Sequence, residues 1–344
     1  MRPRELRLLV MHVSTRCDQT CAHCSIWRGR GRSGAELGVG ERVDLIRQAR
    51  LLGARSVLFT GGEPLLCDHL EVLAREAHGL GLAVQIASNG LGLARATPWI
   101  AEVVAEVCLS VEGPEAIHDR VRGPAMFSRL RDAIAALRSR SQAPRLIGRC
   151  VVTSLNASVL DETVAAAKAL GLDAVSFLPV DVKTQAFGGE PQGRRGLRPA
   201  EADVEALRAA VSRLAAAGDL GEFVIEDGAK LMRMADGFLE GDTLRRAPEC
   251  NAPEWSSVVE ADGALRPCFF QPVLARTGGA GSLRGVRGSD AYATALRGLG
   301  SGNPICAACV CPKRAPTGVE AVRARVGAIL RRALPTSALP GVPA

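Results

Sequence analysis

The sequence predicts an α/β fold, a partial (β/α)6 TIM-type barrel followed by a small cysteine-rich module at the C-terminus. Two observations support this prediction. Short apolar runs alternate with longer segments of helical periodicity up to about residue 180, which is typical of crossover units in a parallel sheet. After about residue 248 the long helical segments end, and cysteine, proline and glycine become frequent. Six strand–helix repeats form only part of a barrel, because a complete one has eight.

The predicted strands are short and apolar, and several are bounded by glycine, asparagine or proline. Between them, apolar residues recur at helical spacing, for example over residues 43–52 and 159–170. Helical periodicity returns over residues 200–217 and, more weakly, over 226–240, after a glycine-rich stretch that is predicted to be a loop. The six strands span Leu6–Val13, Ser56–Thr60, Ala83–Ala87, Val107–Val111, Leu146–Val152 and Ala174–Pro179.

The same patterns divide the chain into three parts. Residues 1–248 are predicted to form the barrel with a helical extension, and residues 249–312 the small module. Residues 313–344 are predicted to form a basic helix followed by a disordered tail, because proline and small residues dominate the end of the chain.

The composition is that of a globular protein, with 47% hydrophobic and 23% charged residues. No apolar run is long enough to cross a membrane and no signal peptide is recognisable, so we expect a cytoplasmic protein. The formal net charge is +7, but aromatic residues are not interleaved with the basic ones, which argues against nucleic-acid binding. Eleven cysteines in such a chain favour metal or redox chemistry over disulfides. Cys108 and Cys150 lie inside apolar runs and are expected to be core residues.

Three cysteines directly follow the first predicted strand. The spacing of Cys17, Cys21 and Cys24 suits one [4Fe–4S] cluster, because a short loop can wrap three corners of a cube. The fourth iron then has no protein ligand and is open to a small molecule, whereas ligation by four cysteines favours plain electron transfer. Sites in barrels lie at the C-terminal ends of the strands, where this trio falls. A zinc site with His23 as fourth ligand is the alternative.

Glycines and small polar residues end the next three strands. The two glycines of Gly61–Pro64 let the backbone approach a ligand closely, and the glutamate beside them can accept hydrogen bonds from an ammonium group. Ser88 and Asn89 end the third strand and Ser110 the fourth, where such side chains can hold ribose hydroxyls or a carboxylate. Taken alone, the Gly-Gly motif is only a weak signal, and the strand-end motifs are more typical of turns and helix caps.

Together these motifs resemble the radical S-adenosylmethionine (SAM) superfamily over about residues 6–180, since the three cysteines match its Cys-x3-Cys-x2-Cys signature. The resemblance implies a [4Fe–4S] cluster whose open iron binds SAM. One departure from the family is Ser25 where an aromatic residue often follows the third cysteine, and Trp27 is expected to replace that packing. Arg122 is a further possible partner for the SAM carboxylate. The contacts with SAM that the resemblance implies are Gly61, Gly62, Glu63, Pro64, Ser88, Asn89, Ser110 and Arg149.

A second group of cysteines lies near the C-terminus. Cys250 and Cys268 flank a hairpin-like stretch, in which Asp262-Gly263 is a strong signal for a two-residue turn. Such a hairpin would bring the two cysteines close together, and a Cys-x2-Cys pair follows at residues 306–309. Four thiolates of this kind suit structural zinc and a closed iron–sulfur cluster equally.

This region resembles the twitch module, the shortened form of the SPASM domain of many radical SAM enzymes. The resemblance implies a small C-terminal iron–sulfur module with one auxiliary [4Fe–4S] cluster, and Cys311 is a spare thiol or an alternative ligand. The four ligands that it implies are Cys250, Cys268, Cys306 and Cys309.

The family resemblance implies an oxidoreductase that reductively cleaves SAM to a 5′-deoxyadenosyl radical and abstracts a hydrogen atom from its substrate. The auxiliary cluster would then take up an electron, giving net oxidation of a small molecule or modification of a peptide. The implied partners are that substrate and an electron donor such as flavodoxin or ferredoxin. Only 16 residues precede Cys17, so we expect no leader-recognition domain before it. The alternative function is an iron–sulfur carrier or scaffold without SAM chemistry.

Overall fold

The computed structural model describes residues 5–29, 36–188, 191–239, 250–277, 281–300, 302–307 and 309. Six parallel strands form the curved inner layer of the molecule, and neighbouring strands in the sheet follow one another in the sequence. This arrangement confirms the predicted α/β fold and partial barrel. The strand boundaries differ from the predicted ones by no more than two residues. The strands are β1 (Leu8–Ser14), β2 (Ser56–Gly61), β3 (Ala83–Ser88), β4 (Glu106–Ser110), β5 (Arg145–Val152) and β6 (Ala174–Pro179).

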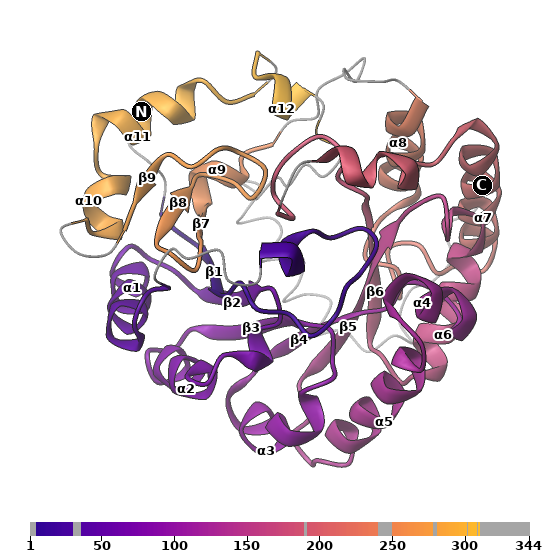
Figure 1. Ribbon diagram of the computed structural model, residues 1–344, viewed down its shortest axis with the longest axis horizontal. Coiled ribbons are helices and arrows are strands. Elements are labelled where there is room, and N and C mark those ends of the chain that lie inside the picture. The colour runs from indigo at the N-terminus through magenta and orange to yellow at the C-terminus, as the bar shows by residue number, and fades with distance from the viewer. Residues whose placement is uncertain are drawn as a thin grey trace, which may run out of the picture.

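Helices cover the outer face of these strands, as Figure 1 shows for α1, α2, α3, α5 and α6. The predicted periodic segments are confirmed as α1, α6, α7 and α8. The glycine-rich stretch predicted as a loop contains one short 3-10 helix, η4 (Pro191–Leu197). The helices up to residue 239 are α1 (Val39–Leu51), α2 (Leu70–Gly79), α3 (Leu93–Val103), α4 (Glu115–Arg122), α5 (Met126–Arg138), α6 (Leu160–Ala169), α7 (Glu201–Ala216) and α8 (Gly228–Leu239). Three further 3-10 helices are η1 (Ile26–Gly29), η2 (Pro64–Leu66) and η3 (Ala157–Val159).

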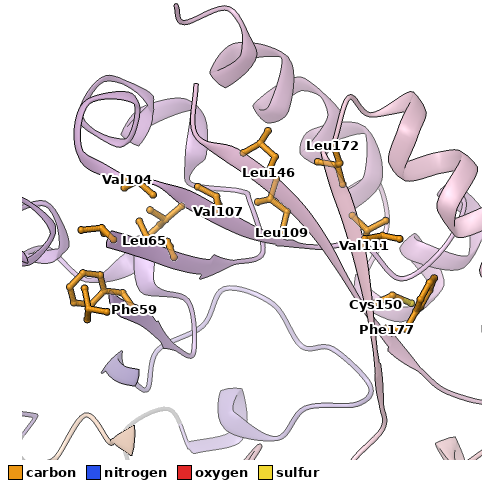
Figure 2. Packing of buried hydrophobic residues seen from close by; sticks show 14 of the residues in the cluster. Phe59, Leu65, Val104, Val107, Leu109, Val111, Leu146, Cys150, Leu172 and Phe177 are labelled. Atoms are coloured by element: carbon orange, nitrogen blue, oxygen red, sulfur yellow. The ribbon is translucent and has the colours of Figure 1, made fainter. Parts of the chain in front are cut away.

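The hydrophobic core lies between the strands and the outer helices. Every second residue of a strand faces this core, which follows from the two-residue period of a pleated strand. On β4 these residues are Val107 and Leu109, both fully buried (Figure 2). Cys108 and Cys150 are buried, as the sequence predicts, but they lie in different clusters. Cys150 faces the helices, whereas Cys108 contacts Ile147 on the inner side of the sheet.

The C-terminal strands extend the barrel sheet. β7 (Ser256–Val259) pairs in parallel with β1, and β8 (Ala264–Arg266) and β9 (Ala275–Arg276) follow antiparallel, so that the order is β6-β5-β4-β3-β2-β1-β7-β8-β9. Short helices surround these strands in Figure 1, namely α9 (Ala252–Trp255), α10 (Leu283–Arg287), α11 (Asp290–Arg297) and α12 (Pro304–Ala307). The boundary at 248/249 stays a prediction, and residues 313–344, the expected basic helix and tail, lie outside the described residues together with Cys311.

The predicted hairpin between Cys250 and Cys268 is present, but the prediction of a two-residue turn is wrong. The turn spans Glu260–Gly263, with the Gly263 amide donating to the Glu260 carbonyl at 3.0 Å. Gly263 has a φ of 81°, the left-handed conformation that closes a longer turn and that glycine adopts without strain. No helix of the described residues is both long and apolar enough to span a membrane.

Candidate functional site

The loop that carries the three cysteines leaves the C-terminal end of β1 and is bound to the end of β2. The Gly62 amide donates to the Ser14 carbonyl at 2.8 Å, and the Glu63 amide donates to the Arg16 carbonyl at the same distance. A Cβ atom on Gly62 would overlap the Arg16 carbonyl, and Gly61 has a φ of 135°. The glycines therefore let the cysteine loop lie directly against β2.

The Glu63 carboxylate joins the ends of β2 and β3. It is 1% exposed and accepts hydrogen bonds from the Ser88 hydroxyl at 2.8 Å, the Asn89 amide at 2.8 Å and the Leu65 amide at 3.0 Å. Burial raises the pKa of Glu63 to about 7, although these hydrogen bonds act in the opposite direction. Its side chain thus caps η2, which begins at Pro64, and holds the neighbouring strand end in place.

The other strand-end residues lie around the same loop and on the inner face of the barrel. The Asn89 side chain donates to the Asp18 carboxylate of the cysteine loop at 2.7 Å. Ser110 pairs with Arg149 across β4 and β5. The Arg149 Nε atom is buried and has no hydrogen-bond partner among the described residues, so this guanidinium has a donor available for an anionic group.

The loop after β1 carries Cys21, which is buried, and Cys17 and Cys24, which are half-buried. Burial, with a further contribution from the like charge of a Cys21 thiolate, raises the pKa of Cys17 to about 12. Burial also raises the pKa of the Cys21 thiol, against the opposing charge of Arg122 and with a further contribution from Cys24. Three neighbouring thiols on one loop fit the three protein-ligated corners of a [4Fe–4S] cluster.

His23 does not join the cysteines as a zinc ligand would. Its Nε2 atom lies 3.9 Å from the Glu112 carboxylate, and burial lowers the pKa of His23 to about 4. Within the described part of the chain, no three His, Cys, Asp or Glu side chains converge as they would around a single metal ion. The position of His23 beside Glu112 therefore argues against zinc with His23 as the fourth ligand.

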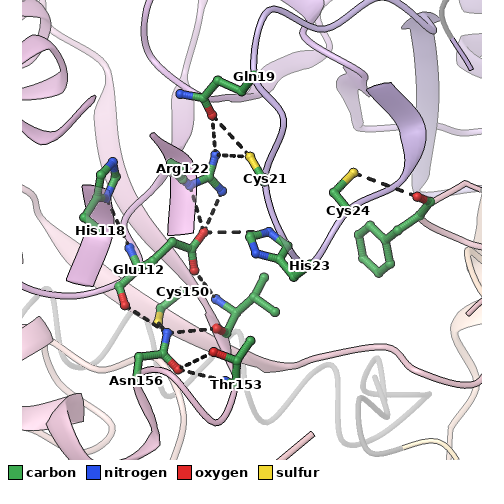
Figure 3. A network of polar contacts seen from close by, with 12 residues as sticks. Gln19, Cys21, His23, Cys24, Glu112, His118, Arg122, Cys150, Thr153 and Asn156 are labelled. Atoms are coloured by element: carbon green, nitrogen blue, oxygen red, sulfur yellow. Dashed lines mark hydrogen bonds and ion pairs between the residues drawn. The ribbon is translucent and has the colours of Figure 1, made fainter. Parts of the chain in front are cut away.

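A buried ion pair supports the cysteine loop from the side of β4 (Figure 3). The Arg122 guanidinium, from the last turn of α4, donates to the Glu112 carboxylate through Nε at 3.0 Å. Its Nη1 atom lies 2.8 Å from the Gln19 side-chain oxygen and 3.5 Å from the Cys21 sulfur. The second Glu112 oxygen accepts from the Val151 amide at 2.9 Å. The sequence offered Arg122 as a SAM partner, but in the structure it contacts the cysteine loop.

The segment after the third cysteine is held by a distant loop and by Trp27. The Ser25 amide donates to the Phe187 carbonyl at 2.8 Å, and the Cys24 thiol lies 3.8 Å from the same oxygen. The Trp27 indole donates to the Cys24 carbonyl at 2.8 Å. Trp27 thus stabilises the loop that an aromatic residue at position 25 would be expected to support.

One pair of residues was missed by the sequence analysis. His12, 6% exposed on the inner face of β1, donates through Nδ1 to the Glu260 carboxylate at 2.8 Å. Its Nε2 atom is buried without a partner among the described residues, and the ring lies 5.5 Å from that of Phe269, next to Cys268. The signal in the sequence was His12 itself, a polar residue within the apolar run of the first predicted strand. The pair can accept a proton where the barrel meets the C-terminal strands.

Contacts through Gln271 join the segments of two of the C-terminal cysteines. The Gln271 amide donates to the Cys268 carbonyl at 3.1 Å, and its side chain donates to the Cys306 sulfur at 3.3 Å. The Cys309 amide donates to the Cys306 carbonyl at 3.1 Å. Cys250 is exposed and begins the segment that leads into β7.

A surface hollow of about 340 Å³ lies at the other end of the strands, lined by the α2–β3 connection and the end of α3. None of the residues predicted for the site lines it. The chemistry-bearing side chains gather instead at the C-terminal ends of β1 to β5, as expected of a barrel.

Comparison with known proteins agrees with this geometry. Residues 11–167 match the sequence model of the Radical SAM superfamily. The chain is similar to SuiB of Streptococcus suis bound to S-adenosylmethionine, with a TM-score of 0.64 and 17% identity over 85% of this chain and 68% of SuiB. It is also similar to anSMEcpe with bound AdoMet, with a TM-score of 0.59 and 19% identity over 84% of this chain and 82% of anSMEcpe. At these identities the structural likeness shows a shared fold.

Proposed function

This chain is a radical SAM enzyme, and from that premise we propose that it catalyses a net oxidation assisted by an auxiliary [4Fe–4S] cluster. Its cofactors as a family member are a [4Fe–4S] cluster and SAM. We assign that cluster to Cys17, Cys21 and Cys24. When bound, cluster and SAM supply a 5′-deoxyadenosyl radical that can take a hydrogen atom from a substrate.

The observation that carries the assignment is the meeting of three chain segments at one end of the sheet. The cysteine loop is fastened to β2 through Gly62 and to β3 through the Asn89–Asp18 hydrogen bond. A carrier protein needs only the cysteines, whereas this arrangement also fixes the strand ends beside them. Cys21 is buried and Cys17 and Cys24 are half-buried, and limited access of water to the loop favours radical chemistry because water can quench reactive intermediates.

Two features support a SAM site next to this loop. Gly61 and Gly62 lie against the backbone of the cysteine loop at Ser14 and Arg16, and Pro64 begins η2 directly after them. On the inner face, Ser110 and Arg149 pair across neighbouring strands, and the unpartnered Arg149 donor suits a carboxylate. Glu63, Ser88 and Asn89 are engaged with one another, so we propose that their side chains shape the site rather than contact SAM.

We propose that the auxiliary cluster is held by Cys250, Cys268, Cys306 and Cys309. Gln271 already joins the segments of Cys268 and Cys306. The pairing of β7, which follows Cys250, with β1 supports a cluster site beside the barrel. A closed cluster there suits an electron acceptor, since all of its irons have protein ligands.

A peptide is the first substrate class to test. SuiB has been seen with the precursor peptide SuiA, and anSMEcpe with the Kp18Cys peptide. The shared fold supports carrying this class over as a proposal, with a small molecule as the second class. A flavodoxin or ferredoxin is the proposed electron donor.

The test is anaerobic reconstitution of the full chain with iron and sulfide, followed by dithionite and SAM. Formation of 5′-deoxyadenosine is expected, and it should disappear in Cys17→Ala. Iron–sulfur absorption without any 5′-deoxyadenosine would instead support the carrier function. A colourless protein that binds zinc would contradict both.

A further inference from the structure

The Arg122 side chain is a charged group that contacts the cysteine loop from within the fold. Its side chain is 7% exposed, and Nη1 lies 3.5 Å from the Cys21 sulfur (Figure 3). This is a hydrogen-bond distance for a sulfur acceptor. The donor is charged and the site is largely shielded from water, so its electrostatic effect on the sulfur is little screened.

The position of this guanidinium is fixed by its other partners. Nε and Nη2 both donate to one Glu112 oxygen, and Nη1 also donates to Gln19. Glu112 is fully buried and is itself held, through its other oxygen, by the Val151 amide. Arg122 is therefore directed at Cys21 by a rigid frame and is already engaged with protein partners.

Glu112 also determines how strongly the positive charge acts. Because the carboxylate lies on the far side of the guanidinium from the sulfur, the pair presents its positive end to Cys21 while remaining neutral overall. An isolated buried cation would act more strongly but at a large desolvation cost. The Glu112–Arg122 pair thus exerts a moderate positive electrostatic potential on one cluster ligand, the Cys21 sulfur.

We propose that Arg122 is a positioning residue that raises the reduction potential of the cluster held by the N-terminal cysteines, through its hydrogen bond to Cys21. The inference rests on the proposed cluster assignment. Reduction adds negative charge that is shared with the thiolate sulfurs, and a donated N–H bond stabilises that charge. Hydrogen bonds and charges around the ligands are established means of setting such potentials.

The test is a redox titration of the reconstituted full chain, followed by electron paramagnetic resonance. The cluster in question is identified as the signal that changes when SAM is added. Arg122→Gln is expected to lower the ratio of reduced to oxidised cluster at a given potential at least tenfold, which is 59 mV for one electron. Arg120→Gln is the matched control, because Arg120 is an exposed arginine of the same helix and carries the same charge. The reduction potential of the cluster in Arg120→Gln should equal that in the unsubstituted protein.

Two further variants keep the test decisive if Arg122→Gln does not load a cluster. Arg122→Lys retains the charge but lacks the branched guanidinium that can donate to Glu112 and Cys21 at once. A smaller decrease in the reduction potential than in Arg122→Gln is therefore expected. Glu112→Gln leaves the guanidinium charge uncompensated and should raise the potential. Unchanged potentials in these variants, or a shift equal to that of Arg120→Gln, would overturn the inference. If the unsubstituted protein gave no SAM-responsive signal, the proposed function would fail first.

Discussion

The two groups of cysteines differ in how much of their arrangement is built by the rest of the protein. The N-terminal loop is bound by β2, β3, α4 and the loop of Phe187, and Cys21 is 7% exposed. In the C-terminal group, Cys250 is exposed and the link between Cys268 and Cys306 runs through Gln271.

We infer from this difference that the N-terminal site is formed by the protein itself, whereas the C-terminal site would be completed by its cofactor. A loop held by strand ends keeps its shape whether or not a metal is bound. Where a bound metal joins separate segments, as it would in the C-terminal group, its free energy of binding is also the free energy of local folding. We therefore expect the N-terminal site to be sensitive to its structural partners and the C-terminal site to the presence of its cluster.

The largest effect is expected from removing one thiol in each group. Cys21→Ala should abolish formation of 5′-deoxyadenosine, because two remaining thiolates do not hold the SAM-binding cluster. Cys268→Ala should retain this reaction within about tenfold, a barrier change of about 1.4 kcal/mol, and lose oxidation of the substrate. Chromatography of 5′-deoxyadenosine measures the first reaction in both variants. Equal loss in the two variants would contradict the separate roles assigned to the two groups.

The next effect concerns the frame of the N-terminal site. Glu63→Ala removes the acceptor of three buried donors, Ser88, Asn89 and Leu65, and should destabilise the protein by about 4 kcal/mol. Glu63→Gln should cost less, since one acceptor oxygen remains. Urea unfolding of the metal-free protein measures both changes. A loss below about 1 kcal/mol in the alanine variant would show that the carboxylate does not hold the strand ends.

Acid should weaken the packing around α4, because His118 of this helix is buried at 1% exposure. Burial lowers the pKa of His118 to about 4, with Arg122 acting in the same direction against Glu112 and Asp119. The pKa of His118 is lower in the folded protein than in the unfolded chain, so below pH 6.5 the unfolded chain binds a proton that the folded protein does not. The stability contributed by neutral His118 is therefore fully present above pH 6.5 and is lost as the pH falls towards 4.

His118→Gln should therefore reduce the loss of stability between pH 7 and 4.5 by about 2 to 3 kcal/mol. Denaturant unfolding at the two pH values measures it, and His78→Gln, at an exposed site, is the control. A pH dependence that is the same in all three proteins would rule out His118 as its source.

The smallest effect is expected at the C-terminal group. Gln271→Ala removes one side-chain link to Cys306 and should loosen α12 by about 1 kcal/mol. Hydrogen exchange should be faster in peptides covering residues 302–307 and unchanged in those covering the cysteine loop. Reconstitution of the auxiliary cluster should slow exchange in both the variant and the unsubstituted protein. Faster exchange at the N-terminal loop would indicate that the two groups are not independent.

Local patterns were sufficient to predict the strands and the residue types of the site. The six barrel strands follow from short apolar runs, and the cysteine loop follows from spacing alone. The hairpin turn was misjudged in length, because Asp-Gly also ends a longer turn when the glycine takes its last position. Propensity does not distinguish these two registers.

Contacts between distant residues could not be predicted from one sequence. Arg122 meets Cys21 across 101 positions, and His12 meets Glu260 because β7 pairs with β1. The role of Glu63 was uncertain for the same reason, since its partners Ser88 and Asn89 are supplied by another strand. Whether a carboxylate faces a ligand or its own fold depends on tertiary packing.

The pairing of β7 with β1 has a consequence for any shortened form of this protein. β1 is an interior strand only because Ser256–Val259 covers it. A chain cut after residue 248 would leave the backbone amides and carbonyls of Leu8–Met11 as an uncovered sheet edge made of apolar residues. Such an edge is a template for intermolecular strand addition, so the shortened protein should aggregate.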